Sequence, residues 1–257
     1  MANILSKRLM AIAKLVTPGG RLADIGTDHA LLPIALIRDG VVPSAIAMDI
    51  NEGPLARARE GIYRYELGER ITTRLSDGFE ALRPGEADSA VIAGMGGDLM
   101  IRILTQGIDT VRTLQEIICS PQSEIARVRA FARNSGFCID AEDMVLEDGK
   151  YYQMFRLKRA ACEPECVIDR KTVDEMQDVW DHYGPLLIRD RNPVLIGFLE
   201  RERRQAEQIL QALEQGGNGR EERKRQIGTR LERIEKARQA MAGGLGETGK
   251  GEQEWVL

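Results

Sequence analysis

The first 160 residues alternate short apolar runs with segments in which apolar residues recur at helical spacing. This alternation is typical of β-α-β units, in which helices connect the buried strands of a mainly parallel sheet. Turn residues separate the segments, as Pro18-Gly19-Gly20 does before the first strand. The predicted strands are residues 21–25, 44–50, 71–75, 89–95 and 116–121.

The stretches between these strands predict helices. The expected helices are an amphipathic one before the first strand, one that begins near Ala30, and residues 51–67, 98–111 and 124–135. Residues 138–159 then alternate between apolar and polar types around Asp148-Gly149, a dipeptide that favours a tight β-hairpin. We therefore expect an α/β fold whose mainly parallel, seven-stranded sheet ends in an antiparallel hairpin.

Beyond Lys158 the apolar pattern is helical only. The expected helices are residues 169–182, 194–215 behind Pro193, and 220–241, with an apolar seam of Ile209, Leu213, Ile227, Leu231, Ile234 and Met241. This spacing predicts an antiparallel, coiled-coil-like hairpin, although two helices within one domain would show the same pattern. The predicted division is a first domain at 1–160, a helical domain at 161–242 and a glycine-rich, disordered tail at 243–257.

Charge and composition exclude several classes of protein. The net charge of −4 argues against a polycation that binds nucleic acid by charge alone, although residues 189–238 hold 13 Lys or Arg against 9 Asp or Glu. No apolar run approaches the roughly 20 residues that a bilayer requires, and the N-terminus lacks a signal-peptide cleavage site, so we expect a cytoplasmic protein.

The four cysteines do not predict a disulfide framework or a metal site. Cys119 and Cys138 lie in apolar runs, and three residues separate Cys162 from Cys166. Zinc sites usually combine two closely spaced pairs of ligands, and the chain has only two histidines. Reduced thiols and no bound metal are therefore expected.

Residues 22–33, LADIGTDHALLP, place a sharp turn between a buried strand and a helix. Gly26 allows a ligand to approach the backbone closely, and the following helix presents free N–H groups. The dinucleotide pattern G-x-G-x-x-G is absent, because Asp28 stands where the second glycine would be. The carboxylates of Asp24 and Asp28 would repel a pyrophosphate but attract a sulfonium and an ammonium group. This loop therefore favours S-adenosyl-L-methionine over NAD.

Acidic and glycine residues also follow the other strands. Asp49 ends the second strand, where its carboxylate can accept hydrogen bonds from ribose hydroxyls, and Asp77 follows the third, where it can accept from an adenine amino group. His29 is either a structural residue beside the loop or part of the site. The predicted cofactor-binding residues are Asp24, Gly26, Thr27, His29, Asp49, Ile50, Asp77, Gly78, Gly94, Met95, Gly96 and Gly97.

Five motifs together resemble a known family. They are DIGTDHALLP, AMDIN, SDGFEAL, AGMGG and VLEDGKYYQM, and in this order and spacing they are similar to the bacterial tRNA (adenine-N1)-methyltransferases of the TrmK type. The resemblance covers residues 3–160 closely, and the helical C-terminal part is similar to the coiled-coil domain of that family. One difference lies after the fifth strand, where residues 119–122 read CSPQ and a Gln-Pro-Asn type of sequence is expected.

The resemblance implies a Rossmann-like class I methyltransferase fold, S-adenosyl-L-methionine as cofactor, S-adenosyl-L-homocysteine as product, and a substrate adenosine at position 22 in the D-loop of tRNA. It also implies a role for Asp28 on the substrate side, with His29 as a second candidate. We predict that Asp28 is catalytic, because a fixed carboxylate would stabilise the positive charge that spreads over adenine as N1 is methylated. The loop at 93–97 lacks the acceptor side chain that a methylase of the 6-amino group would need, which favours N1.

Basic residues on the first helix and on the helical hairpin are candidates for contact with tRNA phosphates. They are Lys7, Arg8, Lys14, Arg201, Arg204 and Arg223. For the hairpin the alternative is an ordinary solvated face, since glutamates are interleaved with the arginines. The competing functions are a methyltransferase for another RNA or a small molecule, and a non-catalytic RNA-binding protein. No membrane contact and no stable protein partner are expected.

Overall fold

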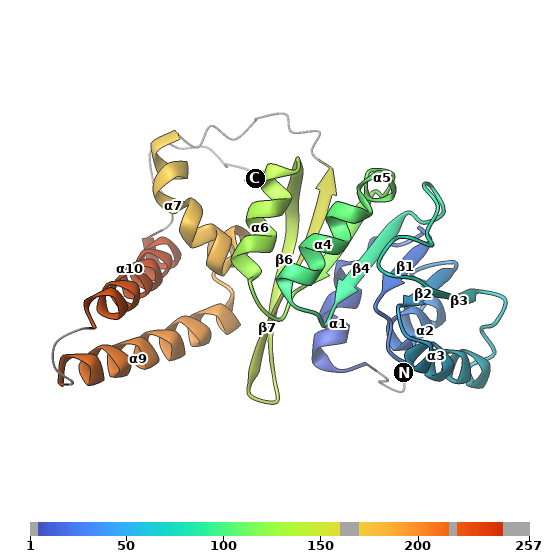
Figure 1. Cartoon of the computed structure of the whole chain (residues 1–257), viewed down its shortest axis with the longest axis horizontal. Coiled ribbons are helices and arrows are strands. Elements are labelled where there is room, and N and C mark those ends of the chain that lie inside the picture. The colour runs from blue at the N-terminus through green and yellow to red at the C-terminus, as the bar shows by residue number, and fades with distance from the viewer. Residues whose placement is uncertain (1–4, 160–169, 216–219, 244–257) are drawn as a thin grey trace. The chain divides into compact units, whose positions relative to one another are not determined.

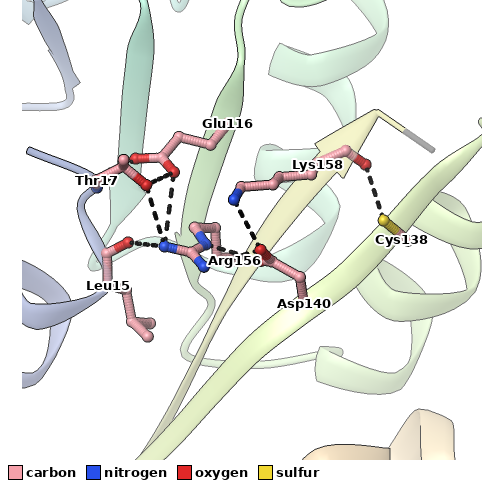
Figure 2. Close-up of polar contacts among 7 residues, drawn as sticks. All are labelled: Leu15, Thr17, Glu116, Cys138, Asp140, Arg156 and Lys158. Carbon is pink, nitrogen blue, oxygen red and sulfur yellow. Dashed lines mark hydrogen bonds and ion pairs between the residues drawn. The ribbon is translucent and has the colours of Figure 1, made fainter. Parts of the chain in front are cut away.

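The computed structural model describes residues 5–159, 170–215 and 220–243, which fall into two compact units, 1–163 and 164–257 (Figure 1). The predicted glycine loop at 216–219, the tail at 244–257, Cys162 and Cys166 lie outside the described residues. None of the described helices is long and apolar enough to cross a membrane. Cys119 is a buried thiol, and the thiol of Cys138 donates to the carbonyl oxygen of Lys158 at 3.5 Å (Figure 2).

The first unit contains a seven-stranded sheet with the order β3-β2-β1-β4-β5-β7-β6. Its strands are β1 (Leu22–Ile25), β2 (Ala45–Asp49), β3 (Ile71–Leu75), β4 (Ser89–Ala93), β5 (Glu116–Ser120), β6 (Phe137–Glu147) and β7 (Lys150–Arg159). The first five strands are parallel, and β7 pairs antiparallel with both β5 and β6. The predicted sheet and its terminal hairpin are therefore confirmed. The strand order reverses between β1 and β4, and in such sheets ligands bind at the carboxyl ends of the strands beside that point.

Six helices lie among the described residues of this unit. They are α1 (Lys7–Leu15), α2 (Leu31–Arg38), α3 (Glu52–Arg64), α4 (Gly97–Gln106), α5 (Ile108–Val111) and α6 (Ile125–Asn134). The single helix predicted at 98–111 was wrong, because Gly107 ends α4. A Cβ atom on Gly107 would lie only 2.6 Å from the Cβ atom of Phe79, so the position requires glycine.

Two apolar clusters, one on each face of the sheet, form the core of this unit. Successive residues of a strand point to opposite faces, so Leu22 joins one cluster and Ala23 the other. Residues of α1, α2 and α3 complete the first cluster, and residues of α4, α5 and α6 complete the second. Because both faces are covered, the central strands read as almost continuous apolar runs.

Arg156 on β7 fixes the end of α1 to the sheet (Figure 2). Its Nη1 atom donates to the carbonyl oxygen of Leu15 at 3.0 Å and to the hydroxyl of Thr17 at 3.2 Å. Its Nε and Nη2 atoms donate to Asp140, which lies at a register shift in β6. Such a bulge redirects a side chain, here toward Arg156. The backbone N–H of Thr17 in turn donates to Glu116 at 2.7 Å.

The hairpin of β6 and β7 extends past the carboxyl end of β5. Since β5 pairs with residues 155–158 of β7, residues 150–154 run beyond it. Helix α1 packs against both hairpin strands, and the backbone N–H of Lys7 donates to the side chain of Glu147 near the turn. The first turn of α1 therefore lies at the carboxyl edge of the sheet, where a ligand is expected.

The second unit is helical. Its helices are α7 (Arg170–Tyr183), α8 (Pro185–Arg189), α9 (Pro193–Gln215) and α10 (Glu221–Gly243). Helix α10 packs against α7 and α8 as well as α9. The two long helices are therefore part of a larger helical unit, which agrees with the alternative of two helices within one domain. Of the predicted seam, Ile227, Ile234 and Met241 are buried, and Ile209, Leu213 and Leu231 are half-buried. The buried residues Leu195, Leu199 and Ala206 of α9 were missed.

Candidate functional site

The loops that follow β1, β2, β3 and β4 all leave the same edge of the sheet, because these strands are parallel. Each loop carries residues predicted for the site. Asp24 is buried inside β1, and burial, opposed by the Thr27 hydroxyl and reinforced by the charge of Asp49, raises the pKa of its carboxyl from 3.8 to about 6. A carboxyl group with a strongly shifted pKa at the edge of a sheet is a candidate for a binding or catalytic role.

The loops after β1 and β4 meet where the side chain of Met95 lies against Gly26. Gly26 has φ +76°, and a Cβ atom there would lie 2.9 Å from the terminal methyl of Met95. Its backbone N–H and that of Thr27 both donate to the carbonyl oxygen of Met48, which fixes the turn above β2. This turn therefore brings the backbone at Gly26 against the side chain of Met95 in the loop at 94–97.

The loops after β2 and β3 place two carboxylates at the same edge. Asp49 accepts a hydrogen bond from the backbone N–H of Asn51 at 2.7 Å, and Asp77 lies 3.6 Å from Arg102. Ile50 is 55% exposed, an unusual position for so large an apolar side chain at a strand end. Two oxygen acceptors beside an open apolar side chain can together bind an adenosine.

The glycines of the β4 loop are explained by different contacts. A Cβ atom on Gly97 would lie 2.6 Å from the carbonyl oxygen of Ser123, so this glycine is needed for packing against the loop after β5. Gly96 likewise lies against the Ser123 hydroxyl. Gly94, by contrast, is exposed with φ +83°, and Arg8 lies beside it. Sequence reasoning gave all of these glycines one role, because it could not see the neighbouring loop.

Asp28 lies at the tip of the β1 loop, and Arg57 on α3 holds its side chain. The Oδ1 atom of Asp28 accepts from Nη2 of Arg57 at 2.9 Å and lies 3.5 Å from Nε2 of His29. His29 and Ala30 both have positive φ, 60° and 51°, which is rare for two consecutive residues other than glycine. Such strain persists only where surrounding contacts impose it, and it is common at functional sites. Arg57 was missed, because an arginine on an exposed helix gives no signal in the sequence.

The candidate RNA-binding residues lie on both units. Lys7 and Lys14 are exposed on α1, and the guanidinium carbon of Arg8 lies 5.3 Å from the centre of the Tyr152 ring. Arg204 pairs with Glu200 of its own helix at 3.6 Å, and Arg223 donates to Gln226 at 3.1 Å. Short-range pairs of this kind are typical of solvated helices. Contact between RNA and helices α9 and α10 therefore stays a prediction.

The residues at the carboxyl edge fit S-adenosyl-L-methionine better than a dinucleotide. Three carboxylates, those of Asp24, Asp49 and Asp77, lie at the carboxyl ends of the first three strands, and they suit the sulfonium, the ammonium and the ribose hydroxyls of that cofactor. Within the described residues, no group of three or more His, Cys, Asp or Glu side chains could hold a metal ion.

This fold and this site define a class I methyltransferase, and a model of the methyltransferase domain family matches residues 5–155. A relative from Bacillus subtilis (strain 168), named tRNA (adenine(22)-N(1))-methyltransferase, is 30% identical over 90% of this chain and 94% of its own length. The chain therefore belongs to the TrmK family of tRNA (adenine(22)-N1)-methyltransferases.

Two solved structures are similar to the described fold. A putative tRNA (m1A22) methyltransferase of Streptococcus pneumoniae superposes with a TM-score of 0.80 at 29% identity, covering 91% of this chain and 99% of that one. TrmK of M. capricolum in complex with S-adenosyl-homocysteine superposes with a TM-score of 0.74 at 26% identity, covering 91% and 97%. Both comparisons span far more than the methyltransferase domain, so the resemblance to the TrmK family is confirmed.

Proposed function

We propose that this chain transfers a methyl group from S-adenosyl-L-methionine to N1 of adenosine 22 in the D-loop of tRNA. The observation that carries the proposal is the set of acidic strand ends at one edge of the sheet, in a chain that matches nearly the whole length of a relative named for this reaction. A tRNA substrate would place the protein in the cytoplasm, as the sequence predicts.

The bound cofactor supplies an electrophilic methyl group on its sulfonium. N1 of adenine carries a lone pair at neutral pH, so the protein needs no strong base, and its main task is to orient the two reactants. The carboxylate of Asp28 would stabilise the positive charge that develops on adenine. Arg57 positions that carboxylate, since it donates twice to Oδ1 of Asp28, from Nε at 3.2 Å and from Nη2 at 2.9 Å.

The choice of N1 over the 6-amino group is supported by the loop after β4. Residues 93–97 read AGMGG, so this loop offers no carboxylate or amide side chain to accept a hydrogen bond from the amino group. The adenosine must leave its stack to reach the edge of the sheet. The exposed side chains of Lys7 and Lys14 on α1 are suited to hold the neighbouring phosphates.

The test is methylation of an unmodified tRNA transcript with labelled cofactor, followed by nuclease digestion and identification of the nucleoside. We expect N1-methyladenosine, and no incorporation into a transcript with guanosine at position 22. Incorporation into metabolites but not into tRNA would favour a small-molecule methyltransferase. A chain that binds neither S-adenosyl-L-methionine nor its homocysteine product would instead be a non-catalytic RNA-binding protein.

A further inference from the structure

The loop after β5 is fixed against the loop after β4 by backbone hydrogen bonds. The N–H of Gln122 donates to the carbonyl oxygen of Met95 at 2.9 Å, and the N–H of Gly97 donates to that of Ser123 at 3.1 Å. Both loops follow parallel strands, so they leave the sheet at its carboxyl edge. Side chains on such a braced pair of loops are held in place, as a specific binding site requires.

Gln122 places a side-chain amide beside the first glycine of the β4 loop. Its Nε2 atom lies 4.0 Å from the point where a Cβ atom on Gly94 would be. Because Gly94 has no side chain, the amide can lie over the backbone of this loop. The next residue, Met95, contacts the corresponding point on Gly26 in the β1 loop at 2.9 Å. Gln122 therefore lies next to the junction of the β1 and β4 loops, where this fold binds its ligands.

The amide of Gln122 is open to a ligand. The residue is exposed, and among the described residues no hydrogen bond engages its side chain. The β4 loop itself, residues 93–97, carries no polar side chain. A glutamine amide offers an acceptor oxygen next to a donor nitrogen. This pair of groups matches one edge of adenine, on which the 6-amino group donates and N7 accepts.

We propose that Gln122 selects adenine by binding this edge, with Oε1 accepting from the 6-amino group and Nε2 donating to N7. Gln122 would thus recognise the substrate base of the proposed function, on which this inference rests. The amide engages only the amino N–H that faces N7, so N1 keeps its lone pair open to the methyl group. Guanine offers acceptors at both O6 and N7, which one amide cannot satisfy in this way. Stabilisation of the developing charge stays with Asp28.

The test changes one atom of the substrate together with one side chain of the protein. Two tRNAs carry either adenosine or 7-deaza-adenosine at position 22, and kcat/KM is measured for each. In Gln122→Ala the value for adenosine should fall by about 10- to 100-fold, the range of a two-bond contact to a base. The preference for adenosine over 7-deaza-adenosine should be about 3- to 10-fold smaller than in the wild type, since only the wild type loses a hydrogen bond to N7.

Gln122→Glu should invert this preference. Its carboxylate still accepts from the amino group but repels the lone pair of N7, so 7-deaza-adenosine should become the better substrate. Gln122→Asn keeps the amide on a shorter side chain and should retain part of the preference for adenosine. The matched control is Gln115→Ala, because Gln115 is an exposed glutamine that precedes β5 at the opposite edge of the sheet. This variant should treat both tRNAs as the wild type does.

Two results would overturn the inference. If the wild type, Gln122→Ala and Gln122→Glu share one preference between the two tRNAs, Gln122 does not contact N7. If Gln122→Ala weakens the binding of S-adenosyl-L-homocysteine by the same factor as it lowers kcat/KM, Gln122 supports the cofactor pocket and does not select the base. A wild-type chain that forms no N1-methyladenosine on the adenosine tRNA contradicts the proposed function, and with it the premise of this inference.

Discussion

At the scale of single residues, the buried carboxylate of Asp24 lowers the stability of the folded protein. Its carboxyl is buried, and burial raises its pKa from 3.8 to about 6, so at neutral pH the folded chain carries a charge that its interior disfavours. The cost is absent below the unfolded pKa of 3.8, grows as pH rises toward the folded value of about 6, and is fully present above it. Proteins commonly keep a destabilising group where function needs it. Here the buried carboxylate is suited to bind a cationic cofactor.

We therefore predict that Asp24→Asn stabilises the protein. At pH 7.5 the gain should be on the order of 3 kcal/mol, the value of about two pKa units, and it should shrink as pH falls from 6 to 4. Urea unfolding at several pH values measures it. The same variant should bind S-adenosyl-L-homocysteine more weakly, since the amide cannot neutralise the ammonium group. A variant less stable than the wild type at pH 7.5 would contradict the argument.

Asp28 is expected to act on the reaction and not on cofactor binding. We predict that Asp28→Asn lowers the single-turnover rate of tRNA methylation by about 10- to 100-fold, a typical loss for one electrostatic contact to a transition state. The dissociation constant of S-adenosyl-L-homocysteine should not change. Asp39→Asn, at the exposed end of α2, serves as control. Asp28→Asn with the full single-turnover rate would remove Asp28 from catalysis.

Much of the site could be predicted at this scale, because it follows strand ends. Asp24, Asp49 and Asp77 each end or follow an apolar run that the sequence shows directly. Arg57 and the packing role of Gly97 could not, since both depend on residues that only the folded chain brings close. The same holds for Arg8, whose contact with Gly94 joins the first helix to the loop after the fourth strand.

At the scale of elements, the central strands were predictable because the sheet is covered on both faces, so that these strands read as almost continuous apolar runs. The break between α4 and α5 was not, because Gly107 is set by its contact with Phe79 from another loop. The bulge at Asp140 could not be predicted from the sequence either, although it directs the carboxylate of Asp140 to Arg156 and Lys158. Burial raises the pKa of Asp140, but hydrogen bonds from these two cations lower it below its usual value overall.

Helix α6 is attached to the terminal hairpin by a buried ion pair, and this attachment allows a prediction. Nη2 of Arg129 lies 2.8 Å from Oε1 of Glu142 and donates to Gln153 at 2.8 Å, with both charged side chains almost fully buried. Arg129→Met would remove this ion pair from the buried carboxylate of Glu142 and should cost about 3–5 kcal/mol in urea unfolding.

The double variant Arg129→Met with Glu142→Leu should recover much of this loss, because no buried charge remains. Arg127→Gln on the same helix is the control, since its exposed pair with Asp98 should contribute less than about 1 kcal/mol. If Arg129→Met and Arg127→Gln unfold at the same urea concentration, the buried pair does not hold α6 on the hairpin.

At the scale of the whole molecule, the similarity to the family extends over the helical unit as well as the sheet unit. The B. subtilis relative is matched over 94% of its length, which the methyltransferase domain alone cannot account for. Many basic side chains of α9 and α10 nevertheless pair with glutamates of their own helices, as Arg203 does with Glu207 and Arg225 with Glu222. These pairs are exposed and weak, so a phosphate can replace the glutamate at little cost.

The last prediction decides between a solvated helical face and an RNA-binding one. In the double variant Arg204→Gln with Arg223→Gln, each lost phosphate contact should lower the dependence of tRNA affinity on salt by about one unit of slope. KM for tRNA should rise several-fold at moderate salt, while the affinity for S-adenosyl-L-homocysteine stays unchanged because the acidic strand ends lie in the other unit. Glu200→Gln, which frees Arg204 from its partner, should change KM in the opposite direction. If neither variant alters KM or the salt slope, α9 and α10 face solvent through these arginines, and the tRNA contacts belong to α1 and the sheet unit.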